Sequence, residues 1–339
     1  MEPALKKKVF EIHDERTFWE TALEVFSFQA ARVPVYREYL ERLGTVPGRI
    51  TSVEQIPFLP VEFFRTHRVI AEGYDPEITF ESSGTTGDGS GIPGTPSPAR
   101  SRHHVARASL YRESFTRAFS MFYSDPEGLC LLALLPSYLE RSGSSLIYMT
   151  EQLISLTGHP DSGFYLDDLE ALASLLRKRT SDRQRTLLLG VSFALLDLAG
   201  RFPMKLGPNI TIMETGGMKG RRREMIRSEL HGLLKKAFGL DRIHSEYGMT
   251  ELLSQAYSAG NGMFLSPPWM SVLIRDPNDP LTLLEGGRPG GINIIDLANL
   301  YSCSFLATGD LGRKHPDDSF EVEGRFDQAE VRGCNLLVS

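Results

Sequence analysis

Several short groups of residues have the types and spacing of a nucleotide site. Residues 80–91 read FESSGTTGDGSG, so a β-branched and aromatic approach opens into glycines and hydroxyl side chains. Backbone N–H groups and hydroxyls in such a loop can converge on an anion, and the stretch predicts a phosphate cradle. A surface turn of the same composition is the structural alternative. A Walker A loop is excluded, because Ser90 stands where its lysine would be.

Three more motifs follow in order along the chain. They are EYGMTE at 246–251, ATGD at 307–310 and GRFDQAEVRG at 324–333. Between them, METGGMKG at 213–220 places two glycines before a basic stretch that we expect to be a helix. Free amides at the beginning of that helix would suit an anion, whereas a solvated basic face is the simpler interpretation.

The composition of the chain excludes several functional classes. The 339 residues carry a net charge of −6 with a pI near 5.8, which does not fit a generic nucleic-acid partner. The N-terminal lysines are not followed by an apolar segment, and no run approaches the roughly 18 apolar residues of a membrane helix. We therefore expect a cytoplasmic protein without a membrane span.

The three cysteines form no pair that would suggest a disulfide framework or a zinc site. Cys130 and Cys303 lie in apolar, strand-like runs, where a buried and inert thiol is expected. Cys334 lies in a short C-terminal tail after Gly333. It is either a spectator or a nucleophile.

Repeated strand, loop and helix patterns indicate an α/β protein with a doubly wound sheet. Strands are expected at 129–135, 183–190, 209–214 and 242–245, each followed by a loop that could carry ligands. Tyr138 and Arg141 follow the first of these strands, where Arg141 could hold a carboxylate or could only cap the loop. From 267 onward, turn residues separate short β-like runs, so the last third is expected to be mostly β-structure.

Two regions before the first of these strands have helical spacing. Residues 7–43 predict two helices joined near Pro34. Residues 100–123 predict a further helix with His103 and His104 at its start, where adjacent side chains diverge and cannot share a metal. Residues 56–70 are rich in aromatic residues and predict either core or the lining of an apolar pocket.

The order of the four motifs resembles the adenylate-forming superfamily of acyl-CoA synthetases, peptide-synthetase adenylation domains and firefly luciferase. The wording of segments such as LLPSYLERSGSSLIYM, METGGMKGRRREMIRSELH and YGMTELLSQAYS is closer still to the LuxE-type acyl-protein synthetases. This resemblance covers nearly the whole chain. It implies one adenylation domain over 1–324, with N-terminal helices over 1–45, and a hinge remnant and tail over 325–339.

The resemblance assigns roles in binding ATP and Mg²⁺. Thr250 would contact the α-phosphate, Glu251 would ligate Mg²⁺, and Asp310 with Arg325 would bind the ribose. Tyr138 and Arg141 would contact the substrate acid. The remaining nucleotide-binding positions are Ser83, Gly84, Thr85, Thr86, Gly87, Gly216, Gly217, Tyr247 and Gly248.

Two departures from the superfamily pattern concern basic residues. A lysine usually follows the glycine loop, and here Arg100 or Arg102 could replace it. The hinge motif normally precedes a mobile lid with a catalytic lysine, whereas this sequence ends fourteen residues after Arg325. Lys219 is the candidate for part of the lysine's task, and the lid is expected to be absent or reduced to the short tail.

In the LuxE-type enzymes a cysteine near the C-terminus takes the acyl group as a thioester, and Cys334 matches it. Cys334 lies nine positions after Arg325, a length of chain that in extended form spans up to roughly 30 Å. The resemblance therefore implies activation of a carboxylic acid, expected to be a fatty acid, with ATP, followed by transfer to Cys334 and then to a partner acyl reductase or another acceptor. The alternatives are a CoA or carrier-protein ligase without an acyl-enzyme, and a weakly active scaffold that binds acyl groups or nucleotide.

Overall fold

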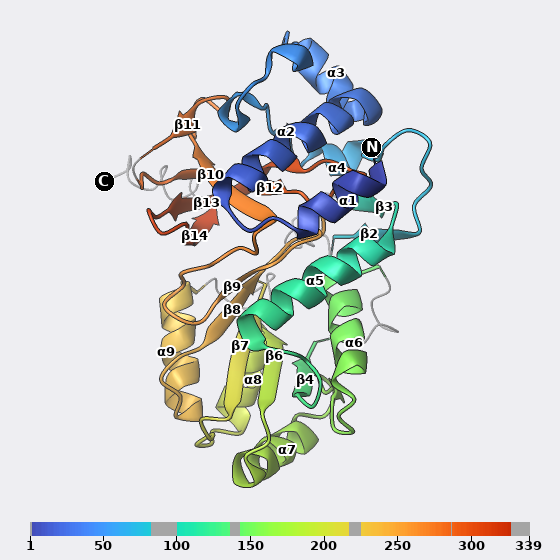
Figure 1. Cartoon of the computed structure of the whole chain (residues 1–339). Helices are drawn as coiled ribbons and strands as arrows, with labels where there is room; N and C mark the ends of the chain where they lie inside the picture. Colours follow the sequence, from blue (N-terminus) through green and yellow to red (C-terminus); the bar gives the residue numbers. More distant parts are fainter. Residues whose placement is uncertain (1, 83–99, 136–142, 217–224, 286, 327–339) are drawn as a thin grey trace, which may run out of the picture.

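The structure is a computed structural model that describes residues 2–82, 100–135, 143–216, 225–285 and 287–326. Figure 1 shows two parts, one built on a sheet flanked by α6 to α9 and one built on a second sheet beside α1 to α4, with α5 lying across their junction. The helices are α1 (Glu2–Phe10), α2 (Glu15–Arg32), α3 (Pro34–Arg42), α4 (Phe63–Thr66), α5 (Ala108–Tyr123), α6 (Ser145–Thr157), α7 (Leu169–Asp182), α8 (Ser192–Arg201) and α9 (Arg227–Phe238).

The strands fall into two larger sheets and one separate pair. They are β1 (Leu59–Pro60), β2 (Ile78–Glu81), β3 (Arg102–Val105), β4 (Cys130–Leu134), β5 (Gly163–Phe164), β6 (Thr186–Val191), β7 (Ile210–Thr215), β8 (His244–Tyr247), β9 (Ala256–Ser258), β10 (Met270–Arg275), β11 (Leu283–Leu284), β12 (Gly290–Asp296), β13 (Phe305–Lys314) and β14 (Phe320–Arg325).

The first sheet has the order β5-β4-β6-β7-β8-β9, and all its strand pairs are parallel except β8 with β9. Every residue of β4 and β6 is buried, as expected for strands covered on both faces. This sheet confirms the predicted doubly wound α/β architecture. Its carboxyl edge is where open α/β sheets bind ligands.

The second sheet has the order β1-β13-β12-β10-β11, with β14 paired to β13. Its strands from β10 onward are antiparallel neighbours, which confirms a last third of mostly β-structure. The short β1 comes from the aromatic-rich segment and pairs in parallel with β13. Phe58 and Phe64 of that segment are buried, so it forms core wall.

The N-terminal helices differ in number from the prediction. Two helices join at Pro34 as expected, but α1 is an additional helix before them. α2 begins after Asp14, which caps its N-terminus. The Asp14 carboxylate accepts from the Thr17 backbone amide, and the Thr17 hydroxyl accepts from the Asp14 amide, which forms a capping box. Pro34 occupies the first turn of α3, where its missing N–H costs nothing.

The prediction of a helix over 100–123 was wrong at its beginning. Residues Arg102–Val105 form β3, and the helix starts only at Ala108. Val105 and His103 both face inward with period two, and β3 pairs antiparallel with β2. His103 and His104 therefore lie on a strand, with side chains on opposite faces.

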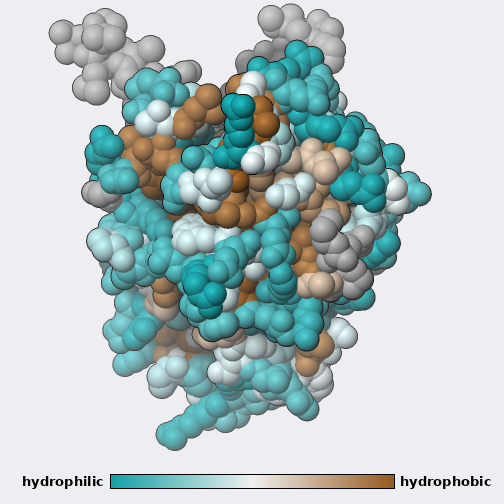
Figure 2. Space-filling view, turned by 45° about the horizontal axis from the view of Figure 1, so that its top comes forward, coloured by the Kyte–Doolittle hydropathy of each residue, from teal (hydrophilic) through white to brown (hydrophobic). Residues whose placement is uncertain are grey.

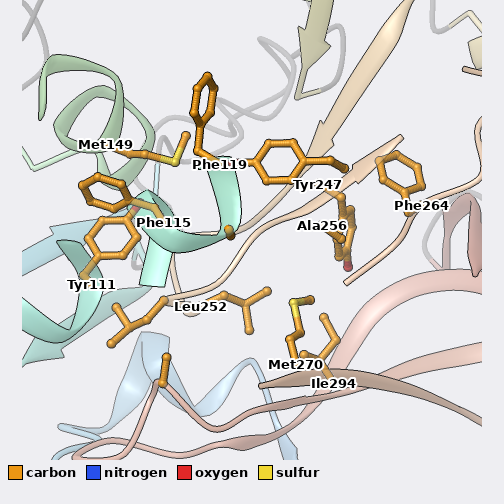
Figure 3. Packing of buried hydrophobic residues seen from close by; sticks show 14 of the residues in the cluster. Tyr111, Phe115, Phe119, Met149, Tyr247, Leu252, Ala256, Phe264, Met270 and Ile294 are labelled. Carbon is orange, nitrogen blue, oxygen red and sulfur yellow. The ribbon is translucent and has the colours of Figure 1, made fainter. Parts of the chain in front are cut away.

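One core joins the two parts of the molecule. In Figure 3, Leu252 lies between two groups of core side chains. Tyr111 and Phe115 of α5 are on one side of it, and Met270 and Ile294 of the second sheet are on the other. Cys130 and Cys303 are buried in this core, and burial raises the pKa of their thiols to about 11 and about 12. The prediction that both thiols are buried is confirmed.

The face of the protein seen in Figure 2 is largely polar. Hydrophilic residues cover most of the face in Figure 2, and hydrophobic residues appear there in separate patches. Among the described residues, no helix combines the length and apolar character needed to cross a bilayer.

Candidate active site

The two ends of the glycine-rich segment lie together beside Glu251. The Ser82 amide donates to the Ser101 carbonyl at 3.0 Å, and the Ser101 amide donates to the Ser82 hydroxyl at 3.0 Å. The Ser101 side chain lowers the pKa of the nearby Glu251 carboxyl group. His103, two residues after Ser101, has its Nδ1 atom 2.9 Å from the Thr250 carbonyl oxygen. The described ends of the glycine-rich segment therefore lie beside the EYGMTE motif.

Glu251 is only 5% exposed. Burial raises the pKa of its carboxyl group, while the hydrogen bond from Ser101 opposes this shift. A cation close to Glu251 would therefore stabilise the ionised form of its carboxyl group.

Tyr247, Asp310 and Arg325 form a second group. The Tyr247 hydroxyl donates to Asp310 Oδ2 at 2.7 Å, joining the end of β8 to β13. Asp310 and Arg325 are register partners across β13 and β14. Burial, followed by the charge of Asp310, holds the pKa of Tyr247 well above its usual range. Residues of the EYGMTE and ATGD motifs and Arg325 of the fourth motif therefore lie together in space.

Two glycines lie at the same edge of the parallel sheet. Gly216 follows β7 with φ +67°, and its carbonyl accepts from the Ser192 hydroxyl at 2.7 Å. At Gly248 a β-carbon would come within 2.5 Å of Glu246 Oε1, so a larger residue would require the Glu246 carboxyl group to move. The backbone here is exposed to close approach from a ligand.

Two buried carboxyl groups were missed by sequence reasoning. Glu246 accepts a short hydrogen bond from the Thr215 hydroxyl, and burial raises its pKa to about 7. Glu214 lies on the opposite face, 3.2 Å from Arg227 Nε and 3.6 Å from His231 Nε2. An acidic residue inside a strand-like apolar run was the only signal of this in the sequence.

The remaining predicted site residues lie outside the described residues. They are Ser83, Gly84, Thr85, Thr86, Gly87, Tyr138, Arg141, Gly217, Lys219 and Cys334. Glu81 lies just before residues 83–99, and Gly143 follows residues 136–142. The Glu81 amide donates to the Gly143 carbonyl at 2.8 Å, so these two flanking positions are in contact.

The described residues contain no group of three or more His, Cys, Asp or Glu side chains that could hold a metal. Mg²⁺ does not require such a group, because it commonly binds one or two carboxylates together with substrate phosphates and water. Glu251, beside the base of the glycine-rich segment, fits that requirement.

A cavity of about 380 Å³ lies elsewhere, between α9 and β14. Its lining includes both basic and acidic side chains, namely Arg227, His231, Lys235, Arg242, Glu321 and Glu323. None of Tyr247, Thr250, Glu251 or Asp310 lines it. The candidate active site is therefore defined by the converging motifs and not by this cavity.

Solved structures with a similar fold identify the class. ATP-bound MatB from Rhodopseudomonas palustris matches with a TM-score of 0.53 and 17% identity, over 73% of this chain and 47% of that chain. 2-Hydroxyisobutyryl-CoA ligase in complex with 2-HIB-AMP matches with a TM-score of 0.63 and 14% identity, over 92% and 68%. This chain spans about half the length of MatB. Its fold is that of the N-terminal domains of adenylate-forming enzymes.

The family is defined more narrowly by the sequence. A profile of the family described as "Acyl-protein synthetase, LuxE" matches residues 11–339, which is nearly the whole chain. The protein belongs to this family. A comparison with curated proteins gave no match.

Proposed function

We propose that this protein activates a carboxylic acid with ATP and carries the acyl group as a thioester before passing it on. The observation that supports the proposal most is the hydrogen bond from Tyr247 to Asp310, with Arg325 opposite and Glu251 beside the base of the glycine-rich segment. Residues far apart in the sequence are thereby grouped as a nucleotide site requires. The family match and the fold shared with ATP-bound and acyl-AMP-bound enzymes agree with this.

The proposed reaction has two steps. A carboxylate oxygen attacks the α-phosphorus of ATP, the bond to the bridging oxygen breaks, and pyrophosphate leaves. The thiolate of Cys334 then attacks the acyl carbon of acyl-AMP, and AMP leaves with the bridging oxygen. A thiolate is the required form, so Arg332 beside Cys334 would favour the reaction by its charge.

Each candidate site residue that the structure describes has a proposed role in the first step. Asp310 and Arg325 bind the ribose hydroxyls, and Tyr247 lies along the adenine while fixing Asp310. Thr250 contacts the α-phosphate, and Glu251 would hold Mg²⁺, which neutralises phosphate charge when bound. Gly216 and Gly248 leave room for the nucleotide.

The other roles belong to segments outside the described residues. Ser83, Thr85 and Thr86, with Gly84 and Gly87, would cradle the phosphates. Gly217 would line the adenine, Lys219 would supply positive charge during adenylation, and Tyr138 with Arg141 would contact the acid. The acyl group, a fatty acid in this proposal, would pass from Cys334 to an acyl reductase or another acceptor protein in the cytoplasm.

The test is intact-protein mass spectrometry after incubation with ATP, Mg²⁺ and a panel of carboxylic acids. We expect a hydroxylamine-labile gain of one acyl group in the wild type and in Cys303→Ala, a matched control for a buried thiol, but not in Cys334→Ser. Pyrophosphate release should persist in Cys334→Ser.

Pyrophosphate release without an adduct in the wild type would overturn the thioester step. Addition of CoA would then show whether the enzyme is a CoA ligase, like the structurally similar 2-hydroxyisobutyryl-CoA ligase. A protein that binds ATP and acyl groups but releases no pyrophosphate with any of the acids would instead be a scaffold.

A further inference from the structure

We infer that His103 and Asn299, which belong to none of the four motifs, are positioning residues that hold Thr250 and Glu251 for adenylation. This inference rests on the proposed function, because it concerns the same site. It starts from the hydrogen bonds of two fully buried polar side chains.

The two side chains contact the EYGMTE motif through its backbone. His103 Nδ1 lies 2.9 Å from the Thr250 carbonyl oxygen, and His103 Nε2 lies 3.0 Å from Asn299 Oδ1. Asn299 Nδ2 donates to the Glu251 carbonyl at 2.9 Å and to the Cys303 carbonyl at 3.0 Å. Consecutive carbonyls of the motif are therefore held by one linked pair of side chains.

The partners determine how the Asn299 amide is oriented. Its nitrogen faces two backbone carbonyls, which can only accept, so its oxygen must face His103. His103 consequently has an acceptor on each side, the Thr250 carbonyl and Asn299 Oδ1. The neutral imidazole has a single N–H and donates to one of these oxygens at a time, and the Nδ1–H tautomer is the one that holds Thr250.

The network also connects the motifs to one another. His103 lies on β3, whose first residues follow Ser101 at the base of the glycine-rich segment. Asn299 precedes β13, the strand that carries Asp310. Gln29 of α2 donates to the Asn299 carbonyl at 3.1 Å and to the Leu300 carbonyl at 2.9 Å, so the N-terminal helices support the same point.

This arrangement explains why a residue without substrate contact would affect the chemistry. Thr250 and Glu251 would act on the α-phosphate and its metal, where a displacement of about 1 Å costs on the order of 100-fold in rate. The hydrogen bond from His103 sets the position of the Thr250 backbone. Loss of that bond should therefore lower the rate of adenylation more than it lowers the affinity for the acid.

Two isosteric variants separate the bonds of His103. His103→Asn can place an amide nitrogen near the position of Nδ1 and keep the bond to Thr250, whereas His103→Gln places one near Nε2, where it can donate only to Asn299. His104→Asn and His104→Gln are matched controls, because His104 faces the other way and bonds Thr79 at 2.9 Å. The measurement is ATP–pyrophosphate exchange at varied ATP and acid, with thermal unfolding of each variant.

We expect kcat/KM for ATP to fall about 100-fold in His103→Gln and less than about 5-fold in His103→Asn, with KM for the acid changed less than about 3-fold. The His104 variants should remain within about 2-fold of the wild type. Equal losses in the two His103 variants, in proportion to their loss of thermal stability, would show a merely structural residue and overturn the inference. So would full activity in His103→Gln.

If His103→Gln cannot be purified folded, Asn299→Ser carries the test. It removes the donor to the Glu251 carbonyl but keeps the backbone carbonyl that Gln29 binds. A fall of about 10-fold in kcat at saturating ATP is expected, and an unchanged kcat would overturn the inference. A wild type that is silent in exchange overturns the proposed function and this inference together, whereas an active wild type with equal variants overturns the inference alone.

Discussion

The candidate site has two sides that are built differently. On the nucleoside side, Tyr247 and Asp310 bond through their side chains, and Asp310 is half-buried beside Arg325 on β14. On the phosphate side, Glu251 is buried and its loop is held by its backbone carbonyls from within the core. The nucleoside side therefore joins a buried tyrosine to a half-buried carboxylate that water can reach, whereas the phosphate side is held entirely within the packing.

This difference predicts how substitutions divide between function and folding. A half-buried carboxylate that loses a partner is solvated by water, so changes at Asp310 should affect ATP binding with little loss of stability. A buried group that loses a partner has no such replacement. Changes behind the phosphate side should therefore reduce both activity and stability, and four predictions test this comparison.

The largest effect is expected for Glu251→Gln. Removing a carboxylate that holds Mg²⁺ should lower ATP–pyrophosphate exchange by about 100- to 1,000-fold, on the order of 3–4 kcal/mol of transition-state stabilisation. The fold should survive, because burial already disfavours the charged form of this group. Glu321→Gln, on the surface of β14, is the matched control. Exchange within about 3-fold of the wild type would remove Glu251 from the metal site.

Glu246→Gln should change how stability depends on pH. Its pKa is about 7 in the folded protein, above the ordinary value of 4.5, so between these values the folded state keeps a proton that the unfolded chain has lost. The free energy of unfolding should therefore fall as pH rises from about 5 to about 7.5, by about 2 kcal/mol from this group. Urea unfolding at both pH values checks this. The variant should lack this part of the decrease, and parallel curves for wild type and variant would contradict it.

Asp310→Asn should raise KM for ATP about 10-fold, since a charged acceptor for the ribose hydroxyls contributes about 1.5 kcal/mol or more. Its effect on kcat at saturating ATP should stay below about 3-fold, because the ribose does not react. The midpoint of thermal unfolding should change little. A large loss of stability with unchanged KM would mean that Asp310 belongs to the packing and would erase the contrast between the two sides.

The smallest effect is expected for Tyr247→Phe. It keeps the ring, which packs against Phe264 and Phe320, and removes only the hydroxyl that bonds Asp310. KM for ATP should rise about 3-fold, corresponding to roughly 0.7 kcal/mol. A double variant with Asp310→Asn should show less than the sum of the two effects, because Tyr247→Phe removes the donor of this bond and Asp310→Asn replaces its charged acceptor with a neutral one. Strict additivity would show that the bond does not contribute to ATP binding.

The sequence was informative where one kind of periodicity dominates. The apolar run of β4 and the spacing of α2 and α3 predicted these elements correctly, because burial on one or both faces leaves a regular pattern. It misled at Arg102–Val105, where the alternation of His103 and Val105 was short enough to be absorbed into the following helix. The strand exists because β2 pairs with it, which is a tertiary fact.

The site was predictable by residue type but not by partner. The bond between Tyr247 and Asp310 joins positions that the motif order had already linked to one nucleotide. The hydrogen bonds of His103 and Asn299 involve backbone carbonyls, which every residue has, so no local pattern could indicate them. The raised pKa of Glu246 was equally hidden, because it results from burial by residues distant in the sequence.

The most direct test of the proposed chemistry follows an oxygen atom. Substrate acid labelled with ¹⁸O in its carboxylate is incubated with the enzyme, ATP and Mg²⁺, the acyl group is released with hydroxylamine, and the AMP is analysed by mass spectrometry. Attack of the carboxylate on the α-phosphorus predicts AMP that carries one ¹⁸O atom. Unlabelled AMP, or label in inorganic phosphate together with ADP, would contradict activation through acyl-AMP.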